Sequence, residues 1–288
     1  MDAARWELES LRRQLAPLLP GLAVEVLARA DSTNTRLLER ARTDARPCLL
    51  VAEEQTAGRG RQGRAWASAP GASLTFSLAL PLAPADWSGL SLAVGVALAD
   101  ALEPADGPRR QDLRIGLKWP NDLWLLDPPD AGAGRSIGRK LGGVLIETVA
   151  SAERRIAVIG IGLNLLPLAD GAPALASGYA GLHELDPAVT APATLARIAA
   201  PLVQALLRFE REGFAPCLPA WARRDLLRGR AVTTTSAAAP EGEAEGVDAQ
   251  GALLLRAGGQ LHRVVSGEVS VRLRPTATAA DLVKAAPC

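Results

Sequence analysis

The segment from 53 to 66, EEQTAGRGRQGRAW, constrains the fold more than any other part of the chain. It has three glycines at G-x-G-x-x-G spacing, with three arginines between and after them: Arg59, Arg61 and Arg64. Glycine allows a positive φ and lets the backbone approach a ligand closely. Arginine offers a planar set of donors that matches carboxylates and phosphates. The segment fits an anion-binding loop, and a solvated flexible turn is the alternative.

The flanking segments exclude one common use of such glycines. A Rossmann dinucleotide fingerprint follows a strand and opens a helix. A strand is predicted at 48–52, but Ala69-Pro70-Gly71 interrupts the chain after the loop, and 73–80 alternates like a second strand. The sequence therefore predicts a strand–loop–strand unit, in which the glycines do not bind a dinucleotide.

Composition limits the remaining classes of function. With 288 residues, 48% of them hydrophobic and 22% charged, we expect a soluble globular protein of one or two domains. The net charge of +1 provides no general field for nucleic acid or anionic membranes. Residues 65–85 are uncharged, but their prolines and Gly71 are incompatible with the ~20-residue membrane helix. Residues 1–20 are predicted as an amphipathic helix without a signal-peptide core, so we expect a cytoplasmic protein.

The potential metal ligands are few and scattered. Cys48, Cys217 and Cys288 have no C-x-x-C spacing, and His183 and His262 are the only histidines. This pattern predicts neither a disulfide framework nor a zinc or multi-histidine site. Only three of the 32 cationic residues are lysines, and two of these lie inside the motifs described next.

Four short polar residues, Asp31-Ser32-Thr33-Asn34, lie between a predicted strand (22–29) and a predicted helix (35–42). An N-cap accounts for them, because short polar side chains accept bonds from the first amides of a helix. As an alternative, their spare hydroxyls and amide bind a small polar ligand.

A Pro-Asn-Asp corner separates two apolar runs within 115–126, IGLKWPNDLWLL. A turn between strands explains the corner. However, Lys118 and Asp122 lie inside otherwise apolar strand segments, where an unpaired charge is costly. Lys140 likewise opens the predicted strand 140–147. The next predicted strand, 155–166, contains regular glycines, which often mark a close approach of backbone or ligand.

The rest of the chain changes character once. Apolar residues at helical spacing predict helices at 88–103 and 194–210, and helical and connecting residues continue to 224. From Arg230 onward, short strands alternate with turns and predict a small barrel. These strands are expected at 231–236, 242–248, 252–256, 260–265 and 268–272. We expect domains at 1–224 and 225–274 and a flexible tail at 275–288.

Taken in order, seven segments resemble the biotin–protein ligase family. They are DSTNT (31–35), EEQTAGRGRQGRAW (53–66), KWPNDL (118–123), RKLGGVLIE (139–147), VIGIGLNL (158–165), EGVDAQGALLL (245–255) and SGEVSVR (266–272). The resemblance covers about residues 22–273. It is to a short bacterial form, since only thirty residues precede Asp31 and no winged-helix DNA-binding domain is visible in them.

The resemblance implies an α+β fold. A mixed β-sheet with flanking helices, related to class II aminoacyl-tRNA synthetases, would precede a small SH3-like β-barrel. It also implies an ATP-dependent ligase that activates biotin as biotinyl-5′-AMP and transfers it to one lysine of a biotin carboxyl carrier protein, as in acetyl-CoA carboxylase. ATP and biotin would be substrates, with Mg²⁺ on the ATP phosphates rather than on protein side chains. The protein would be a monomer or a homodimer without a nucleic-acid or membrane partner.

Roles for individual residues also come from the resemblance. The residues implied to bind biotin are Ser32, Thr33, Asn34, Gln55, Arg59, Gly60, Arg61, Lys140 and Gly143. Those implied to bind the nucleotide are Gly58, Arg59, Arg61, Trp66 and Asn164. Those implied in catalysis are Arg61, Lys118, Asp122 and Lys140. Cations suit the step that joins a carboxylate to a phosphate, because these two anions repel each other.

Three other functions compete with this one. A lipoate–protein ligase of related fold usually has an Arg-Arg-x-(Ser/Thr)-Gly-Gly-Gly loop, whereas this chain has TAGRGR at 56–61. A DNA-binding regulator that senses biotin would need a basic DNA-binding element, and no helix-turn-helix is visible in the sequence. An inactive scaffold is disfavoured by the intact arginines and lysines.

The segment 127–138 is longer than the motifs require, and we expect a surface loop there.

Overall fold

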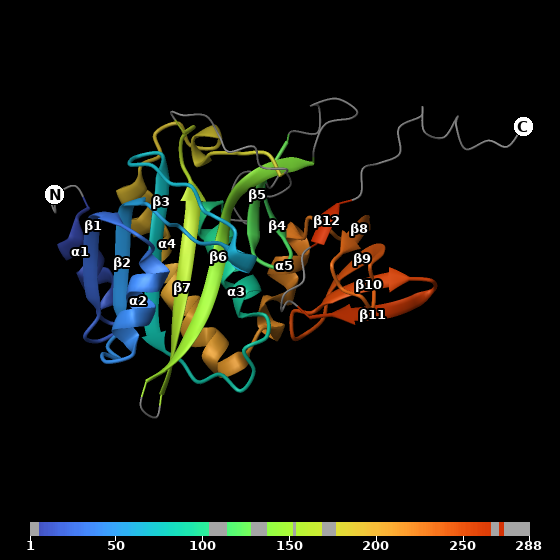
Figure 1. Ribbon diagram of the computed structural model, residues 1–288, viewed down its shortest axis with the longest axis horizontal. Coiled ribbons are helices and arrows are strands. Elements are labelled where there is room, and N and C mark those ends of the chain that lie inside the picture. Colours follow the sequence, from blue (N-terminus) through green and yellow to red (C-terminus); the bar gives the residue numbers. More distant parts are fainter. Residues whose placement is uncertain are drawn as a thin grey trace, which may run out of the picture.

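The computed structural model describes residues 6–103, 114–127, 137–151, 154–168, 177–265 and 271–273. Its centre is a seven-stranded sheet in the order β1-β2-β3-β7-β6-β5-β4 (Figure 1). The strands are β1 (Ala23–Ala30), β2 (Cys48–Gln55), β3 (Ser73–Pro81), β4 (Ile115–Lys118), β5 (Asp122–Leu126), β6 (Gly138–Ser151) and β7 (Arg154–Asn164). Only β1 and β2 pair in parallel, so the mixed sheet is confirmed.

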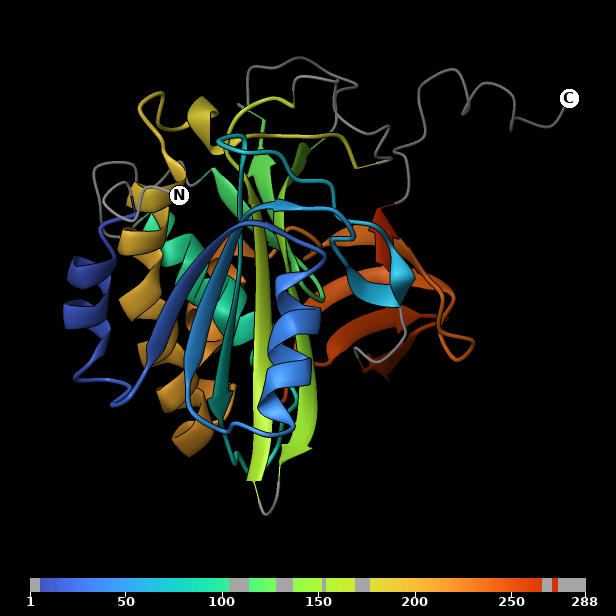
Figure 2. The same ribbon diagram turned by 60° about the vertical axis from the view of Figure 1, so that its left-hand side comes forward.

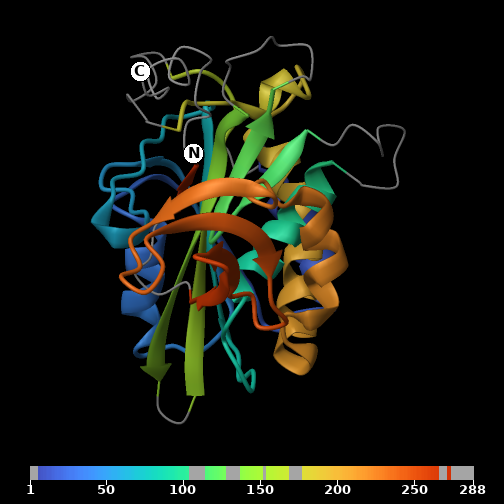
Figure 3. The same ribbon diagram turned by 90° about the vertical axis from the view of Figure 1, so that its right-hand side faces the viewer.

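Helices cover the two faces of this sheet unequally. One face carries most of the helices: α1 (Leu8–Leu15), α3 (Leu90–Leu102), α4 (Ala191–Glu212) and α5 (Leu218–Arg224). The opposite face carries α2 (Thr33–Ala41) and the loop after β2, as Figures 2 and 3 show. The short 3₁₀ turns are η1 (Arg61–Gly63), η2 (Leu182–Glu184) and η3 (Ala215–Cys217).

Strand alternation assigns the side chains to these faces. In β3, Leu74, Phe76 and Leu78 point into the main core under α3 and α4 and are at most 1% exposed. Their neighbours Thr75 and Ser77 point to the α2 face. A smaller apolar cluster on that face joins α2 to the lower half of the sheet: Leu37, Ala41, Cys48, Leu50, Ala79, Ile156 and Val158.

A second sheet follows the helices. Its five strands pair antiparallel in the order β11-β10-β9-β8-β12, to one side of the central sheet in Figure 1. They are β8 (Arg230–Thr234), β9 (Glu241–Val247), β10 (Leu253–Ala257), β11 (Gln260–Val264) and β12 (Val271–Leu273). The pairings among described residues run from β11 to β12 without closing, so the SH3-like barrel remains a prediction.

Specific hydrogen bonds attach this sheet to the corner between β4 and β5 of the central sheet. The indole Nε1 of Trp119 donates to the Gly251 carbonyl at 3.0 Å, and Lys118 Nζ donates to the Val271 carbonyl at 2.7 Å. Both donors lie beside the Pro-Asn-Asp corner between β4 and β5. The corner therefore carries the contact between the two sheets.

A buried guanidinium fixes the end of α5. The Arg224 side chain is fully buried and pairs with Asp100 at 2.9 Å and Glu103 at 3.2 Å, while also donating to the Ile115 carbonyl at 2.9 Å. Pairing of this kind is required, because an unpaired buried charge costs several kcal/mol. It ties α3, β4 and α5 together immediately before the second sheet.

Most predicted elements are confirmed, with shifted ends. The N-terminal helix is shorter than expected and spans only Leu8–Leu15 in the described chain. The helix predicted from residue 35 begins at Thr33, which places Thr33 and Asn34 in its first turn. Residues 128–136 of the expected loop, 266–270 of the last motif and the tail from 274 lie outside the described residues.

Candidate active site

The floor of the site is formed by two glycines of β7 on the α2 face of the sheet. A Cβ on Gly162 would lie 2.6 Å from Cζ2 of Trp66, and one on Gly160 would lie 2.8 Å from Cγ of Asn34. Both distances are far inside van der Waals contact, so any larger residue would displace the side chain above it. The glycines predicted to mark a close approach do so for two side chains of the protein itself.

Polar groups at the start of α2 are buried and hydrogen-bonded. Ser32 is the N-cap and accepts from the Thr35 amide, which confirms the N-cap interpretation. Thr33 donates its backbone amide to Gln55 Oε1 at 2.7 Å. The Ser77 hydroxyl lies 2.7 Å from Thr33 Oγ1 and 2.6 Å from Asn34 Oδ1. The predicted biotin-binding residues Ser32, Thr33, Asn34 and Gln55 thus lie together, at the carboxyl ends of β1 and β2.

The glycine–arginine loop folds back on itself as an irregular hairpin. The Trp66 amide donates to the Gly58 carbonyl at 2.8 Å, and the Gly60 amide donates to the Arg64 carbonyl at 2.7 Å. A Cβ on Gly58 would collide with the Trp66 carbonyl oxygen. The tip turns through Gln62, at φ 57°, next to a glycine at φ 69°. The motif glycines therefore serve the hairpin's own closure.

An ion pair lies at the centre of the site. Lys140 Nζ on β6 is 2.7 Å from Asp122 Oδ1 on β5, and the two side chains are only 20% and 17% exposed. The same ammonium is 5.7 Å from the centroid of the Trp66 ring, a cation–π distance. A Cβ on Gly143 would be 3.5 Å from Asp122 Oδ1. Four of the predicted site residues, drawn from three separate segments of the sequence, thus share one location.

Two more cations lie beside this pair. Burial lowers the pKa of Arg61, and the nearby Asp122 carboxylate opposes that shift while Arg64 adds to it. Burial also lowers the pKa of Lys118, with Asp122 opposing and Lys140 reinforcing the change. Asp122 is therefore the common carboxylate of three cations. The result is a partly desolvated cationic cluster, in which electrostatic interactions are stronger than in water.

Arg59 lies on another side of the loop. Its Nη2 is 2.9 Å from Glu147 Oε1, and its Nη1 is 3.4 Å from Thr35 Oγ1. Arg59 therefore crosses the N-terminal end of α2 and contacts β6. Arg64 Nη2 donates to Gln62 Oε1 at 3.1 Å within the loop.

Asn164 has a structural task in this arrangement. It is 4% exposed, and Nδ2 donates to the carbonyls of Lys140 at 3.2 Å and Ala180 at 3.1 Å. These bonds hold β6, β7 and the segment before η2 together directly beneath Lys140. The structure thus shows Asn164 supporting the site, and its nucleotide contact stays a prediction.

Sequence reasoning missed two residues of this site, Ser77 and Glu147. A serine inside the apolar strand 73–80 and a glutamate at the end of the apolar run 141–146 were visible signals. Each is a polar residue where burial demands a partner. The partners themselves lie 43 and 113 residues away from them along the chain, in both cases at Asn34.

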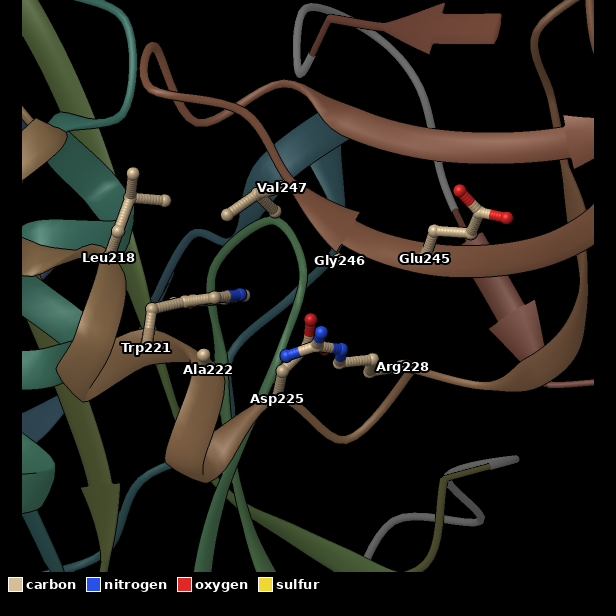
Figure 4. A pocket seen from close by; sticks show the side chains of 8 residues that line it. All are labelled: Leu218, Trp221, Ala222, Asp225, Arg228, Glu245, Gly246 and Val247. Carbon is tan, nitrogen blue, oxygen red and sulfur yellow. The ribbon is translucent and has the colours of Figure 1, made fainter. Parts of the chain in front are cut away.

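A small cavity lies elsewhere, between α5 and the second sheet (Figure 4). Its volume is about 100 Å³, and Trp221, Asp225, Arg228 and Glu245 contribute polar atoms to its lining. None of the predicted site residues lines it.

No group of three or more histidine, cysteine, aspartate or glutamate side chains in the described ranges is arranged to hold a metal ion. In the same part of the chain, none of the helices is long and apolar enough to cross a membrane.

Two family models match the chain. Residues 26–164 match the model described as the Biotin/lipoate A/B protein ligase family, and residues 229–272 match the Biotin protein ligase C terminal domain. The first match contains every predicted site residue, and the second contains the five-stranded sheet apart from its last residue.

Curated relatives and solved structures agree. The bifunctional ligase/repressor BirA of Escherichia coli is 34% identical over 264 residues, 90% of this chain and 77% of that protein. The biotin--[acetyl-CoA-carboxylase] ligase of Paracoccus denitrificans is 34% identical over 80% of this chain and 93% of its own. A biotin protein ligase from Aquifex aeolicus, solved with biotin and ATP, superposes with a TM-score of 0.70 at 26% identity, covering 88% of this chain and 99% of that one.

Proposed function

Because this chain belongs to the biotin/lipoate A/B protein ligase family, we propose that it is an ATP-dependent biotin ligase. It activates biotin as biotinyl-5′-AMP and then biotinylates one lysine of a biotin carboxyl carrier protein. The observation that supports this most is the cluster of Lys140, Arg61 and Lys118 around Asp122, above a glycine floor and next to an indole.

The first step joins two anions. A biotin carboxylate oxygen attacks the α-phosphorus of ATP, the bond to the β-phosphate oxygen breaks, and pyrophosphate leaves. Repulsion between carboxylate and phosphate is the main barrier, so cations held in a partly desolvated site lower it. Lys140, fixed by Asp122, and Arg61 supply that charge, and Arg59 adds to it from the loop. Mg²⁺ accompanies the ATP phosphates, because their oxygens are the hard ligands that this cation prefers.

The second step transfers the acyl group. The amine of the acceptor lysine attacks the carbonyl carbon of the mixed anhydride, AMP leaves, and the amine loses a proton. We assign Asp122, which is paired with Lys140, to receive the incoming amine. No protein nucleophile is needed, because the anhydride is already activated. Closure of the loop over it would keep water out.

Biotin binding requires neutral donors and acceptors. The hydroxyls of Ser32 and Thr33 and the amides of Asn34 and Gln55 suit the ureido ring, and they lie together at the carboxyl ends of β1 and β2. We assign the indole of Trp66, whose ring centroid is 5.7 Å from Lys140 Nζ, to contact the adenine. Gly143 leaves space beside Asp122 and Lys140 for the substrates, while Gly58 and Gly60 let the loop that carries Arg59 and Arg61 close on itself.

The wider assignment is also part of the proposal. The catalytic domain is 1–224, followed by an SH3-like barrel at 225–274, and the enzyme acts as a ligase rather than as a DNA-binding repressor. The carrier domain of a biotin-dependent carboxylase is its partner, because two relatives are biotin--[acetyl-CoA-carboxylase] ligases.

Biotin-dependent exchange of pyrophosphate into ATP tests this function directly. We expect exchange with biotin, followed by biotinylation of an added carrier domain. Exchange that requires lipoate or octanoate would overturn the substrate assignment. A gel shift that persists at physiological salt would overturn the statement about DNA.

Replacement of a single arginine sharpens the test. Arg61→Ala should slow adenylate formation roughly 100-fold, because it removes a preorganised cation from the reacting anions. Arg64→Ala on the same loop is the matched control, since Arg64 is exposed and should change the rate less than about fivefold. Equal rates for Arg61→Ala and the wild type would remove Arg61 from the mechanism.

A further inference from the structure

Glu147 joins two parts of the site that the sequence keeps far apart. Its Oε1 pairs with Nη2 of Arg59 at 2.9 Å, and its Oε2 accepts from Nδ2 of Asn34 at 2.9 Å. Arg59 comes from the glycine–arginine loop and Asn34 from the first turn of α2. One carboxylate on β6 therefore holds both.

The Asn34 amide has one orientation in this network. Nδ2 donates to Glu147 and to the Leu145 carbonyl at 3.3 Å, and Oδ1 lies 2.6 Å from the Ser77 hydroxyl. A flipped amide would place its oxygen against the Glu147 carboxylate and the Leu145 carbonyl. Asn34 is 3% exposed and lies directly over Gly160, so it has no room to move aside. Glu147 therefore determines which atom of Asn34 faces which neighbour.

Arg59 is oriented by the same carboxylate. Without a partner, an arginine side chain on a surface loop samples many rotamers, and holding it costs conformational entropy. The Glu147 side chain is 25% exposed and that of Arg59 is 47% exposed, so Glu147 is the better shielded of the two from solvent. A guanidinium has five N–H donors, and the bonds to Glu147 and Thr35 engage only part of that set.

We propose that Glu147 is a positioning residue for the ligase reaction: it holds Arg59 over the substrate anions and Asn34 over biotin in one fixed geometry. This inference rests on the proposed function. The opposite role is competition, in which Glu147 neutralises Arg59 and the substrate carboxylate must displace it. The two roles predict opposite changes in the KM for biotin when the charge of Glu147 is removed: a rise for positioning and a fall for competition.

Glu147→Gln separates the two roles. Arg59 and Asn34 each bond a different oxygen of Glu147, and in glutamine one of those two positions is an NH₂ group that cannot accept from either donor. We expect the KM for biotin in pyrophosphate exchange to rise about tenfold or more, because a hydrogen bond to a charged group is lost. We expect kcat to change less than KM. A fall in KM for biotin would establish competition and overturn the proposal.

A matched control and a double variant test the mechanism. Glu25→Gln removes the ion pair to Arg40 on α2, away from Ser32–Asn34, and should leave the KM for biotin unchanged. In an Arg59→Ala background, the effect of Glu147→Gln should be smaller than in the wild type, because Arg59 is part of what Glu147 positions. An undiminished effect there would mean that Glu147 acts only on the fold.

Two further measurements keep the outcomes distinct. Glu147→Asp retains the charge but is one methylene shorter, so it should also raise the KM for biotin; a wild-type KM in this variant and in Glu147→Gln overturns the proposal. The free energy of unfolding of each variant, measured in urea, shows whether the fold is intact. Absence of biotin-dependent exchange in the wild type contradicts the proposed function itself. An active wild type with a Glu147→Gln variant that matches Glu25→Gln contradicts only the positioning role.

Discussion

The two faces of the central sheet are built from the same strands but serve different purposes. On β7, Ile159, Ile161 and Leu163 enter the core under α3 and α4, while the alternate positions Gly160 and Gly162 face α2 and the loop. Figure 3 shows the thick helical layer on one side and the single helix α2 with its loop on the other. The first face gains stability from apolar volume.

The α2 face gains something else. Its glycines remove volume so that Asn34 and Trp66 can approach the backbone, and its polar residues are hydrogen-bonded to one another. A buried polar network of this kind adds little net stability but specifies geometry. The comparison teaches that stability and site geometry are separated by strand parity, one residue apart.

The largest effect should come from filling a glycine on the α2 face. Gly162→Ala places a methyl group against the Trp66 ring and must push the indole away from Lys140. We expect pyrophosphate exchange to fall roughly 100-fold, since small misplacements in a site cost that much.

The control for this change lies one residue away on the other face. Ile161→Val removes one methylene from the core and should cost about 1 kcal/mol of stability with the exchange rate retained. If both variants lose stability and activity in the same proportion, the two faces are not functionally separate.

A smaller effect is expected from the paired positions on β3. Ser77→Ala leaves Asn34 Oδ1 and Thr33 Oγ1 with one partner fewer in a buried location. It should cost about 1–3 kcal/mol of stability and raise the KM for biotin. Leu78→Val, on the helix-covered face, should cost about 1 kcal/mol and leave the KM unchanged. Urea denaturation together with exchange kinetics measures both; a normal KM in Ser77→Ala would show that the network does not orient the site.

The smallest effect concerns a polar group on the helix-covered side. Among the described residues, the buried Oδ2 of Asp225, after α5, has no hydrogen-bond partner, and burial raises the pKa of this carboxyl above its usual value of 3.8. The folded state therefore holds this proton more tightly than the unfolded state. As pH rises from 3.8 through the raised pKa, the protein loses stability from this group.

Asp225→Asn removes that titration. Relative to the wild type, the variant should gain stability between pH 4 and pH 7, on the order of 1 kcal/mol. Urea denaturation at the two pH values measures the difference. If the free energy of unfolding changes equally between pH 4 and pH 7 in the variant and the wild type, Asp225 is as well solvated in the folded state as in the unfolded state.

Much of the fold followed from the sequence because its signals are local. Alternating residues predicted β3, regular spacing predicted α3 and α4, and turn residues predicted the short strands after Arg230. Helix and strand ends were less predictable, since capping and packing decide them. The N-terminal helix, for example, is confined to Leu8–Leu15.

The site was predictable where a residue type is unusual for its surroundings. Lys118, Asp122 and Lys140 stood out as charges in apolar strands, and they do meet at one place. Asn164 was predicted to bind the nucleotide, which stays a prediction; its amide is bonded to two backbone carbonyls, which its own segment gave no sign of. The contacts of a single side chain cannot be predicted from its own segment, because other segments supply its partners.

The sequence by itself determined the parity of each strand, the glycine–arginine loop and the order of motifs that resembles the ligase family. Only the tertiary structure decided that Glu147 meets Arg59 and Asn34, which are 88 and 113 residues away, and that Lys118 bonds Val271, 153 residues away. The physical reason is strand order. With β7 inserted between β3 and β6, the register of that sheet decides which distant side chains share a face, and local propensity carries no information about it.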